Sequence, residues 1–134
     1  MYAIIWDESL SVGVRKMDVE HKLLFFLVGR LLNGLKYGGE NLPKNLDNLA
    51  EKAESHFLHE ERLLRLTDFP ATRSHEREHA QLLRKVHEVQ FRLQAGEVGA
   101  LSREVVRGLS DWLEQHIKDS DKEFSAYLNL RGIR

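Results

Sequence analysis

Four stretches of the sequence, each about twenty residues long, repeat apolar side chains at the three-to-four-residue spacing of an amphipathic helix. We expect helices over about 18–37, 42–66, 70–95 and 101–118, followed by a short tail helix over about 121–130. No segment alternates apolar and polar residues with the period of two that is typical of a strand. Because the connections are short, neighbouring helices should run antiparallel. The sequence therefore predicts an all-α fold: an up-down four-helix bundle with an N-terminal arm over 1–17 and a short C-terminal helix.

The ends of the first two predicted helices carry local signals. Asp18 is suited to cap the N-terminus of the first helix, and Gly38 with Gly39 is suited to end it. Asn41 and Pro43 have the residue types that favour the first positions of a helix. We therefore place the first connection between the two glycines and Asn41.

Length and composition narrow the class of protein. A chain of 134 residues predicts one domain, over 1–134, with a sizeable core. The net charge of −1 predicts neither a nucleic-acid partner nor a membrane surface, and no stretch is apolar enough for membrane insertion. The absence of cysteine excludes disulfides and thiolate metal sites, and the N-terminus does not resemble a signal peptide. We therefore expect a cytoplasmic protein.

Six polar side chains fall on the apolar stripes of the predicted helices, where side chains face the core. They are His21 in the first helix, His56 and Glu60 in the second, His75 and His79 in the third, and His116 in the fourth. A buried polar group without a partner costs about 1–3 kcal/mol, and ligation of a metal removes that cost for the whole set. The pairs His56/Glu60 and His75/His79 have the four-residue spacing that lets two side chains share a metal. We therefore predict a metal site inside the bundle.

The stretch from His75 to His79 also reads H-E-x-x-H, the zinc-hydrolase pattern in which Glu76 would be the general base. That alternative leaves the inward polar residues of the other three helices without a role. A ferritin-like oxidase needs two E-x-x-H motifs, and the chain has one. A bundle without metal would have to bury all of these polar side chains unligated. We expect His59 and His87, which turn away from the stripes, at or near the surface.

The order of these residues resembles the hemerythrin family, specifically its single-domain bacterial type, bacteriohemerythrin. The match runs through His21, His56-Phe57-x-x-Glu60-Glu61, Phe69-Pro70, His75-x-x-x-His79 and Trp112-Leu113-x-x-His116-Ile117-x-x-x-Asp121, and covers nearly the whole chain. The resemblance implies two iron ions, Fe2+ or Fe3+, bridged by an oxo or hydroxo group. One iron would be held by His75, His79 and His116, and the other by His21 and His56, with Glu60 and Asp121 bridging both.

Asp121 enters this set through the resemblance alone. It lies five residues after His116, which is about 140° around an ideal helix of 3.6 residues per turn. We therefore expect the fourth helix to end, bend or widen between Ile117 and Asp121.

The implied function is reversible binding of dioxygen, for oxygen transport, storage or delivery, without enzymatic turnover. The implied ligand set leaves one coordination position open, on the iron with two histidines, and the family binds O2 there. Leu113 matches the aliphatic residue of the family's oxygen pocket, and stripe position adds Leu24, Phe25 and Trp112 as candidates. These residues would keep the open position small and apolar.

The physiological role has two parts: whether the protein is a carrier or a sensor, and which partners it has. An oxygen or redox sensor that acts through a partner protein is an alternative to a carrier. A carrier would deliver oxygen to an oxygen-consuming client protein, and we expect it to be a monomer.

Overall fold

The fold is described by a computed structural model that covers residues 6–39 and 41–134. Its long helices are α1 (Arg15–Tyr37), α2 (Leu42–Leu66), α3 (Thr72–Gln94) and α4 (Arg103–His116). A π-helical turn, η3 (Ile117–Asp121), joins α4 to α5 (Lys122–Asn129). Of two short 3-10 turns, η1 (Glu8–Leu10) lies in the arm before α1, and η2 (Val98–Ala100) lies between α3 and α4. The described residues contain no strand.

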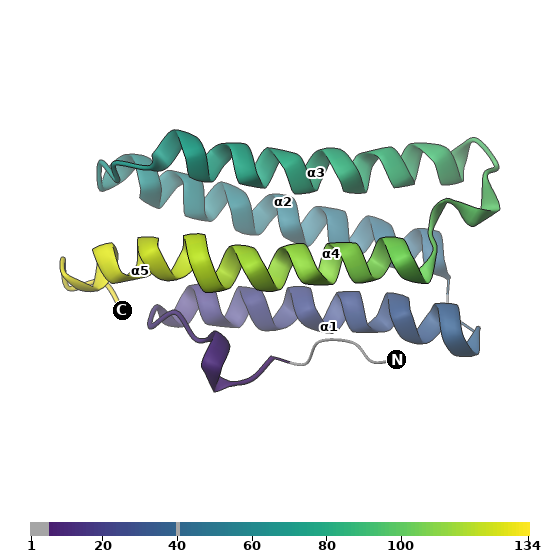
Figure 1. Cartoon of the computed structure of the whole chain (residues 1–134), viewed down its shortest axis with the longest axis horizontal. Helices are drawn as coiled ribbons and strands as arrows, with labels where there is room; N and C mark the ends of the chain where they lie inside the picture. The colour runs from purple at the N-terminus through teal and green to yellow at the C-terminus, as the bar shows by residue number, and fades with distance from the viewer. Residues whose placement is uncertain (1–5, 40) are drawn as a thin grey trace.

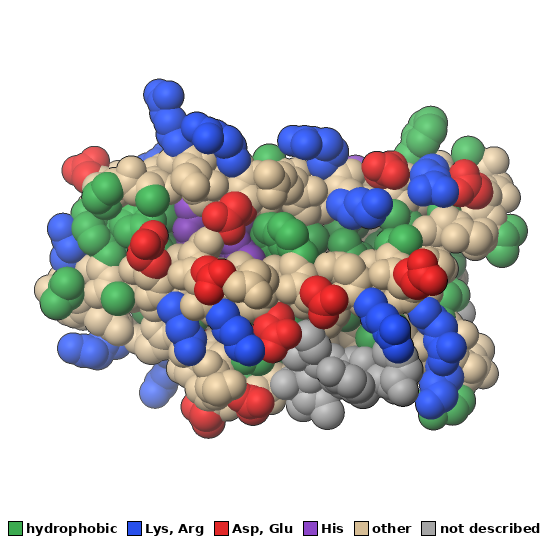
Figure 2. Space-filling view, viewed as in Figure 1, with side chains coloured by type: hydrophobic (Ala, Val, Ile, Leu, Met, Phe, Trp, Pro, Cys, Tyr) green, Lys and Arg blue, Asp and Glu red, His purple; other side chains and the backbone are tan. Residues whose placement is uncertain are grey.

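The four long helices lie side by side, and each runs back along the one before it (Figure 1). The predicted all-α, up-down antiparallel bundle is therefore confirmed. Acidic and basic side chains are interspersed on the face drawn in Figure 2, in line with the net charge of −1. Within the described part of the chain, no helix combines the length and the apolar character that a membrane crossing requires.

The start of α1 differs from the sequence-based expectation. The helix begins at Arg15, inside the expected arm, and its N-cap is Val14 rather than Asp18. The Asp18 carboxylate instead accepts hydrogen bonds from the Val12 backbone N–H at 2.9 Å and from the Ser11 hydroxyl at 2.6 Å. Asp18 thus holds the arm against the first turn of α1. The first five residues of the expected arm lie outside the described residues.

The other helix ends follow local signals, with small shifts. Gly38 ends α1 with a φ of 76°, and the Asn41 side chain caps α2 by accepting from the Lys44 backbone N–H at 3.1 Å. Helix α3 begins at Thr72. Helix α4 begins after its N-cap Ser102, whose hydroxyl accepts from the Val105 N–H at 3.2 Å, and not at the expected residue 101.

The predicted change of helix geometry between Ile117 and Asp121 is confirmed, because these five residues form the π-helical turn η3. A turn closed from residue i to residue i+5 returns the fifth residue to nearly the same face, so Asp121 lies on the face of His116. Asp121 itself has helical φ and ψ of −71° and −36°, and α5 continues from it without a break. The expected short C-terminal helix is therefore present as α5, and it continues α4 through the π-helical turn.

Candidate metal centre

The structure brings all seven predicted ligands together inside the bundle. They are His21 from α1, His56 and Glu60 from α2, His75 and His79 from α3, His116 from α4 and Asp121 from η3. Each of them is at most 4% exposed. Their ligand atoms form two groups, each within a span of 4.8 Å, one with three histidines and one with two. Both groups contain Glu60 and Asp121.

Glu60 divides its two oxygens between the two groups of histidines. Its Oε1 atom lies 2.7 Å from Nε2 of His75 and 3.0 Å from Nε2 of His79. Its Oε2 atom lies 2.8 Å from Nε2 of His56 and 3.8 Å from Nε2 of His21. One carboxylate therefore faces both groups, with one oxygen toward each.

Asp121 divides its oxygens in the same way. Its Oδ1 atom lies 3.0 Å from Nε2 of His75 and 3.2 Å from Nε2 of His116, both in the three-histidine group. Its Oδ2 atom lies 3.1 Å from Nε2 of His21, in the two-histidine group. The π-helical turn makes this possible, because it carries Asp121 onto the inner face of the bundle.

Many of these short contacts are not aligned as hydrogen bonds. The Nε2 atoms of His21, His56 and His116, the Oε2 atom of Glu60 and both oxygens of Asp121 are buried without a hydrogen-bond partner. Nitrogen and oxygen atoms that crowd together in this way leave their lone pairs free for a cation in their midst. Imidazole and carboxylate are ligand types that suit iron, so the residues present fit the implied group.

The close packing of these residues shifts their pKa values. Burial opposes protonation of His56, but the hydrogen bond to Glu20 and the adjacent Glu60 carboxylate outweigh it and raise its pKa to about 10. Burial likewise opposes protonation of His75, and Asp121 and Glu60 raise its pKa to about 10. Burial alone would raise the pKa of Glu60, yet the histidines around it hold that pKa well below 4.5. In the metal-free protein, protons therefore supply the positive charge that a metal would otherwise bring.

Glu20 is a functional residue that the sequence-based ligand set missed. Its Oε1 atom lies 2.7 Å from Nδ1 of His56, and its Oε2 atom lies 2.9 Å from Nδ1 of His59. A carboxylate that accepts the Nδ1 proton orients the imidazole and leaves Nε2 as the lone pair directed at the cluster. Glu20 is the chain neighbour of His21, and it acts on the histidine of the next helix.

The same arrangement recurs on the next two helices. Glu61 of α2 accepts from Nδ1 of His79 in α3 at 2.8 Å. Glu78 of α3 accepts from Nδ1 of His116 in α4 at 2.7 Å, and also from the Ser120 hydroxyl of the π-helical turn at 2.6 Å. Each of these glutamates is the chain neighbour of a predicted ligand, and this adjacency is the sequence feature that could have identified it.

The remaining histidines and Glu76 lie outside the cluster, as expected. The side chains of His59 and His87 are 40% and 52% exposed. The Glu76 carboxylate pairs with the Arg65 guanidinium of α2 at 2.7 Å and belongs to neither group of candidate ligands.

A small apolar cavity lies next to the cluster. Its volume is ≈ 10 Å³, room for about one water-sized molecule, and the eight residues around it are all aliphatic. They form two layers with one residue from each helix: Leu24, Ala53, Leu82 and Leu113, then Val28, Leu49, Val86 and Leu109. Every residue of the first layer is three positions from a cluster histidine, so the cavity begins one helical turn from the ligands.

Two of the four predicted pocket residues, Leu24 and Leu113, line this cavity. Phe25 is buried but does not line it. The Trp112 ring stacks on the His116 ring, with centroids 4.7 Å apart and planes 13° apart. Trp112 therefore contacts a predicted ligand and not the cavity.

Comparisons with known proteins agree with this geometry. The family model of the hemerythrin HHE cation binding domain matches residues 12–128. The chain is 30% identical to a bacteriohemerythrin of Pseudomonas paraeruginosa, over 90% of this chain and 78% of the relative. It is 28% identical to myohemerythrin-1 of Phascolopsis gouldii, over 92% and 93%. A crystal structure of wild-type hemerythrin matches with a TM-score of 0.87 at 27% identity, over 93% of this chain and 97% of that chain. The chain belongs to the hemerythrin family.

Proposed function

We propose that the protein binds dioxygen reversibly at a non-haem di-iron centre, for oxygen transport, storage or delivery. The observation that carries the proposal is the division of the two buried carboxylates. Glu60 and Asp121 each present one oxygen to a group of three histidines and the other oxygen to a group of two. Two metal ions side by side, sharing both carboxylates, account for that pattern.

In this proposal the two ions have unequal ligand sets. His75, His79 and His116 would hold one iron and His21 and His56 the other, and Glu60 and Asp121 would offer one oxygen to each. The side with two histidines has one protein ligand fewer, so it would be the side that leaves room for dioxygen. The names of the relatives, bacteriohemerythrin and myohemerythrin, support the proposal of a non-haem iron protein that binds oxygen.

The irons, when bound, supply the electrons that dioxygen takes up and returns. The residues of the chain hold the ions, orient the histidines and keep water away. Because aliphatic side chains alone line the neighbouring cavity, acids and water find no hydrogen-bond partner there. A dry pocket protects bound dioxygen from protonation and the centre from lasting oxidation.

We further propose a binding role and not an enzymatic one, since no acid or base stands among the residues around the cavity. The zinc-hydrolase alternative needs Glu76 beside a metal, and Glu76 instead pairs with Arg65. A sensor that acts through a partner protein would use the same centre, and reversibility distinguishes it from a carrier.

The test is metal analysis combined with optical spectroscopy of protein purified in air. We expect two irons per chain and absorption bands in the near ultraviolet and visible range. Cycling between oxygen and argon should change the spectrum reversibly in a carrier, whereas lasting oxidation after one exposure would favour a sensor. A colourless protein with a single zinc would overturn the proposal.

A further inference from the structure

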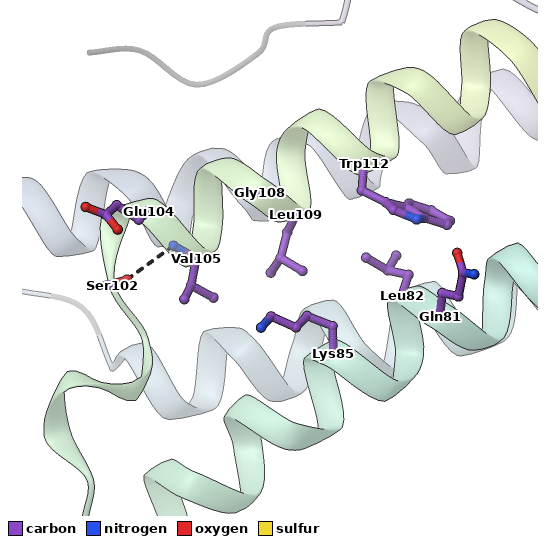
Figure 3. Close-up of a pocket in the computed structure, with 9 residues that line it drawn as sticks. All are labelled: Gln81, Leu82, Lys85, Ser102, Glu104, Val105, Gly108, Leu109 and Trp112. Atoms are coloured by element: carbon purple, nitrogen blue, oxygen red, sulfur yellow. Dashed lines mark hydrogen bonds between the residues drawn. The ribbon is translucent and has the colours of Figure 1, made fainter.

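An open pocket lies in the groove between α3 and α4 (Figure 3). Its volume is ≈ 410 Å³. The side chains of Leu82, Leu109 and Trp112 face one another across it, and the exposed Lys85 also lines it. The pocket thus has an apolar wall on the side of the bundle core.

This pocket and the small cavity beside the metal cluster share part of their lining. Leu82 and Leu109 belong to both. Leu82 stands in the layer next to the cluster, three residues after His79, and Leu109 stands in the second layer. A second open pocket, which is lined by residues such as Trp6, Arg15 and Lys22, shares no residue with the cavity.

We propose that dioxygen enters and leaves the cavity through the groove between α3 and α4, by passing between Leu82 and Leu109. The inference rests on the proposed function and adds the route of dioxygen and its gate, which is the pair Leu82 and Leu109. The two spaces share these leucines as a wall, so the route requires the two side chains to change rotamer. The open pocket then serves as a vestibule from which the gas reaches the core.

The chemistry of the gate selects what passes. An apolar gas loses little when it leaves water for a space between two leucines. A hydrated ion or an acid would have to give up its hydrogen bonds there without replacement. The gate therefore admits dioxygen and holds back the reagents that would oxidise or protonate the centre.

Gly108 gives a direct way to test the route. It lines the vestibule on α4, and a Cβ atom added there would meet no atom within 4 Å. In Gly108→Phe, the new ring would occupy the vestibule without a clash at its base and without touching the predicted ligands. Gly99→Phe is the matched control, because Gly99 also has open space around its Cβ position and does not line the pocket.

The first measurement is the stopped-flow rate of oxygen association and dissociation in iron-loaded protein. In G108F both rates should fall together by about tenfold with Kd unchanged, because one added barrier lies on the path of both steps. G99F should match the wild type. Leu109→Ala, which widens the gate, should raise both rates. Wild-type rates in G108F would overturn the route, and so would a change in Kd, because a barrier shared by both steps cannot alter the ratio of their rates.

The second measurement does not depend on oxygen binding. Crystals of the iron-loaded protein pressurised with xenon should show xenon in the vestibule against Leu82 and Leu109, and G108F crystals should lack it. Absence of xenon from the wild-type vestibule would count against the route. If the wild type failed to bind oxygen reversibly, the proposed function would fail, whereas the xenon result would still report whether an apolar gas uses this path.

Discussion

Replacing Glu20 by glutamine should weaken iron binding on the two-histidine side of the centre and leave the other side nearly intact. Glu20 accepts the Nδ1 proton of His56 at 2.7 Å, whereas the three-histidine side is supported by Glu61 and Glu78. Glutamine keeps the size of the side chain and removes its charge. The substitution therefore tests the orienting role of the carboxylate and not its packing.

The expected magnitude follows from one charged hydrogen bond. Such a bond contributes about 1.5–3 kcal/mol, and the Glu20 side chain is only 23% exposed, so water replaces little of it. Loss of a carboxylate behind a ligating histidine costs about 10- to 100-fold in metal affinity, or about 1.4–2.7 kcal/mol. The two ranges agree, and we expect a 10- to 100-fold loss at the His21–His56 side.

Titration with an iron chelator, followed by metal analysis, measures this effect. The wild type should lose both irons over one range of chelator concentration, whereas E20Q should pass through a state with one iron per chain. Glu54→Gln is the matched control, because Glu54 pairs with the exposed His87 at the same 2.7 Å and lies outside both ligand groups. Equal loss of both irons in E20Q, or the same effect in E54Q, would refute the reasoning.

Three further outcomes are expected. In chelator-treated protein, the free energy of unfolding measured by urea titration should be lower at about pH 10 than at about pH 6. Folding raises the pKa of His56 and of His75 from 6.5 to about 10, so the stability that these histidines contribute is full below pH 6.5 and is lost as the pH rises toward 10. Glu76→Gln should keep two irons and oxygen binding, and its free energy of unfolding should fall by less than about 1 kcal/mol, because the partner Arg65 is 69% exposed. A variant that kept a single zinc and lost a hydrolytic activity of the wild type would instead support the zinc-hydrolase alternative. Ala53→Val should fill the ≈ 10 Å³ cavity and weaken oxygen binding at unchanged iron content, measured by oxygen titration; unchanged affinity would show that dioxygen lies elsewhere.

The sequence was sufficient to place six of the seven clustered residues, because helical periodicity fixes which side chains share a face. Asp121 does not follow from the position of His116, because an α-helix would turn it by about 140° and the π-helical turn between them changes that angle. Measured from Ile117, four residues earlier, Asp121 continues a buried stripe. That stripe consists of Val106, Ser110, Leu113, Ile117, Asp121, Phe124 and Leu128, spaced by three or four residues.

The outer glutamates could not be found from periodicity, because their partners lie on another helix. Glu20, Glu61 and Glu78 stand at the edge of their own stripes, and only the order of helices around the bundle shows which histidine each one faces. The wrong N-cap at Asp18 has a similar origin. A local cap signal cannot show that the arm folds back and takes the carboxylate for Ser11 and Val12.

The polar cluster can be compared with the aliphatic layer beside it, which the same four helices form. One helical turn from His21, His56, His79 and His116, the same four helices present Leu24, Ala53, Leu82 and Leu113, which pack as an ordinary aliphatic layer. Replacing buried charged groups by apolar ones is often neutral or stabilising, by about 1–4 kcal/mol. The chain buries apolar side chains on the other side of the cluster as well, Met17, Leu64 and Phe124 among them, so the polar cluster interrupts an otherwise apolar core. Stability does not explain the polar cluster, because several of its buried atoms, such as Nε2 of His21 and both oxygens of Asp121, have no hydrogen-bond partner, whereas binding of metal ions does.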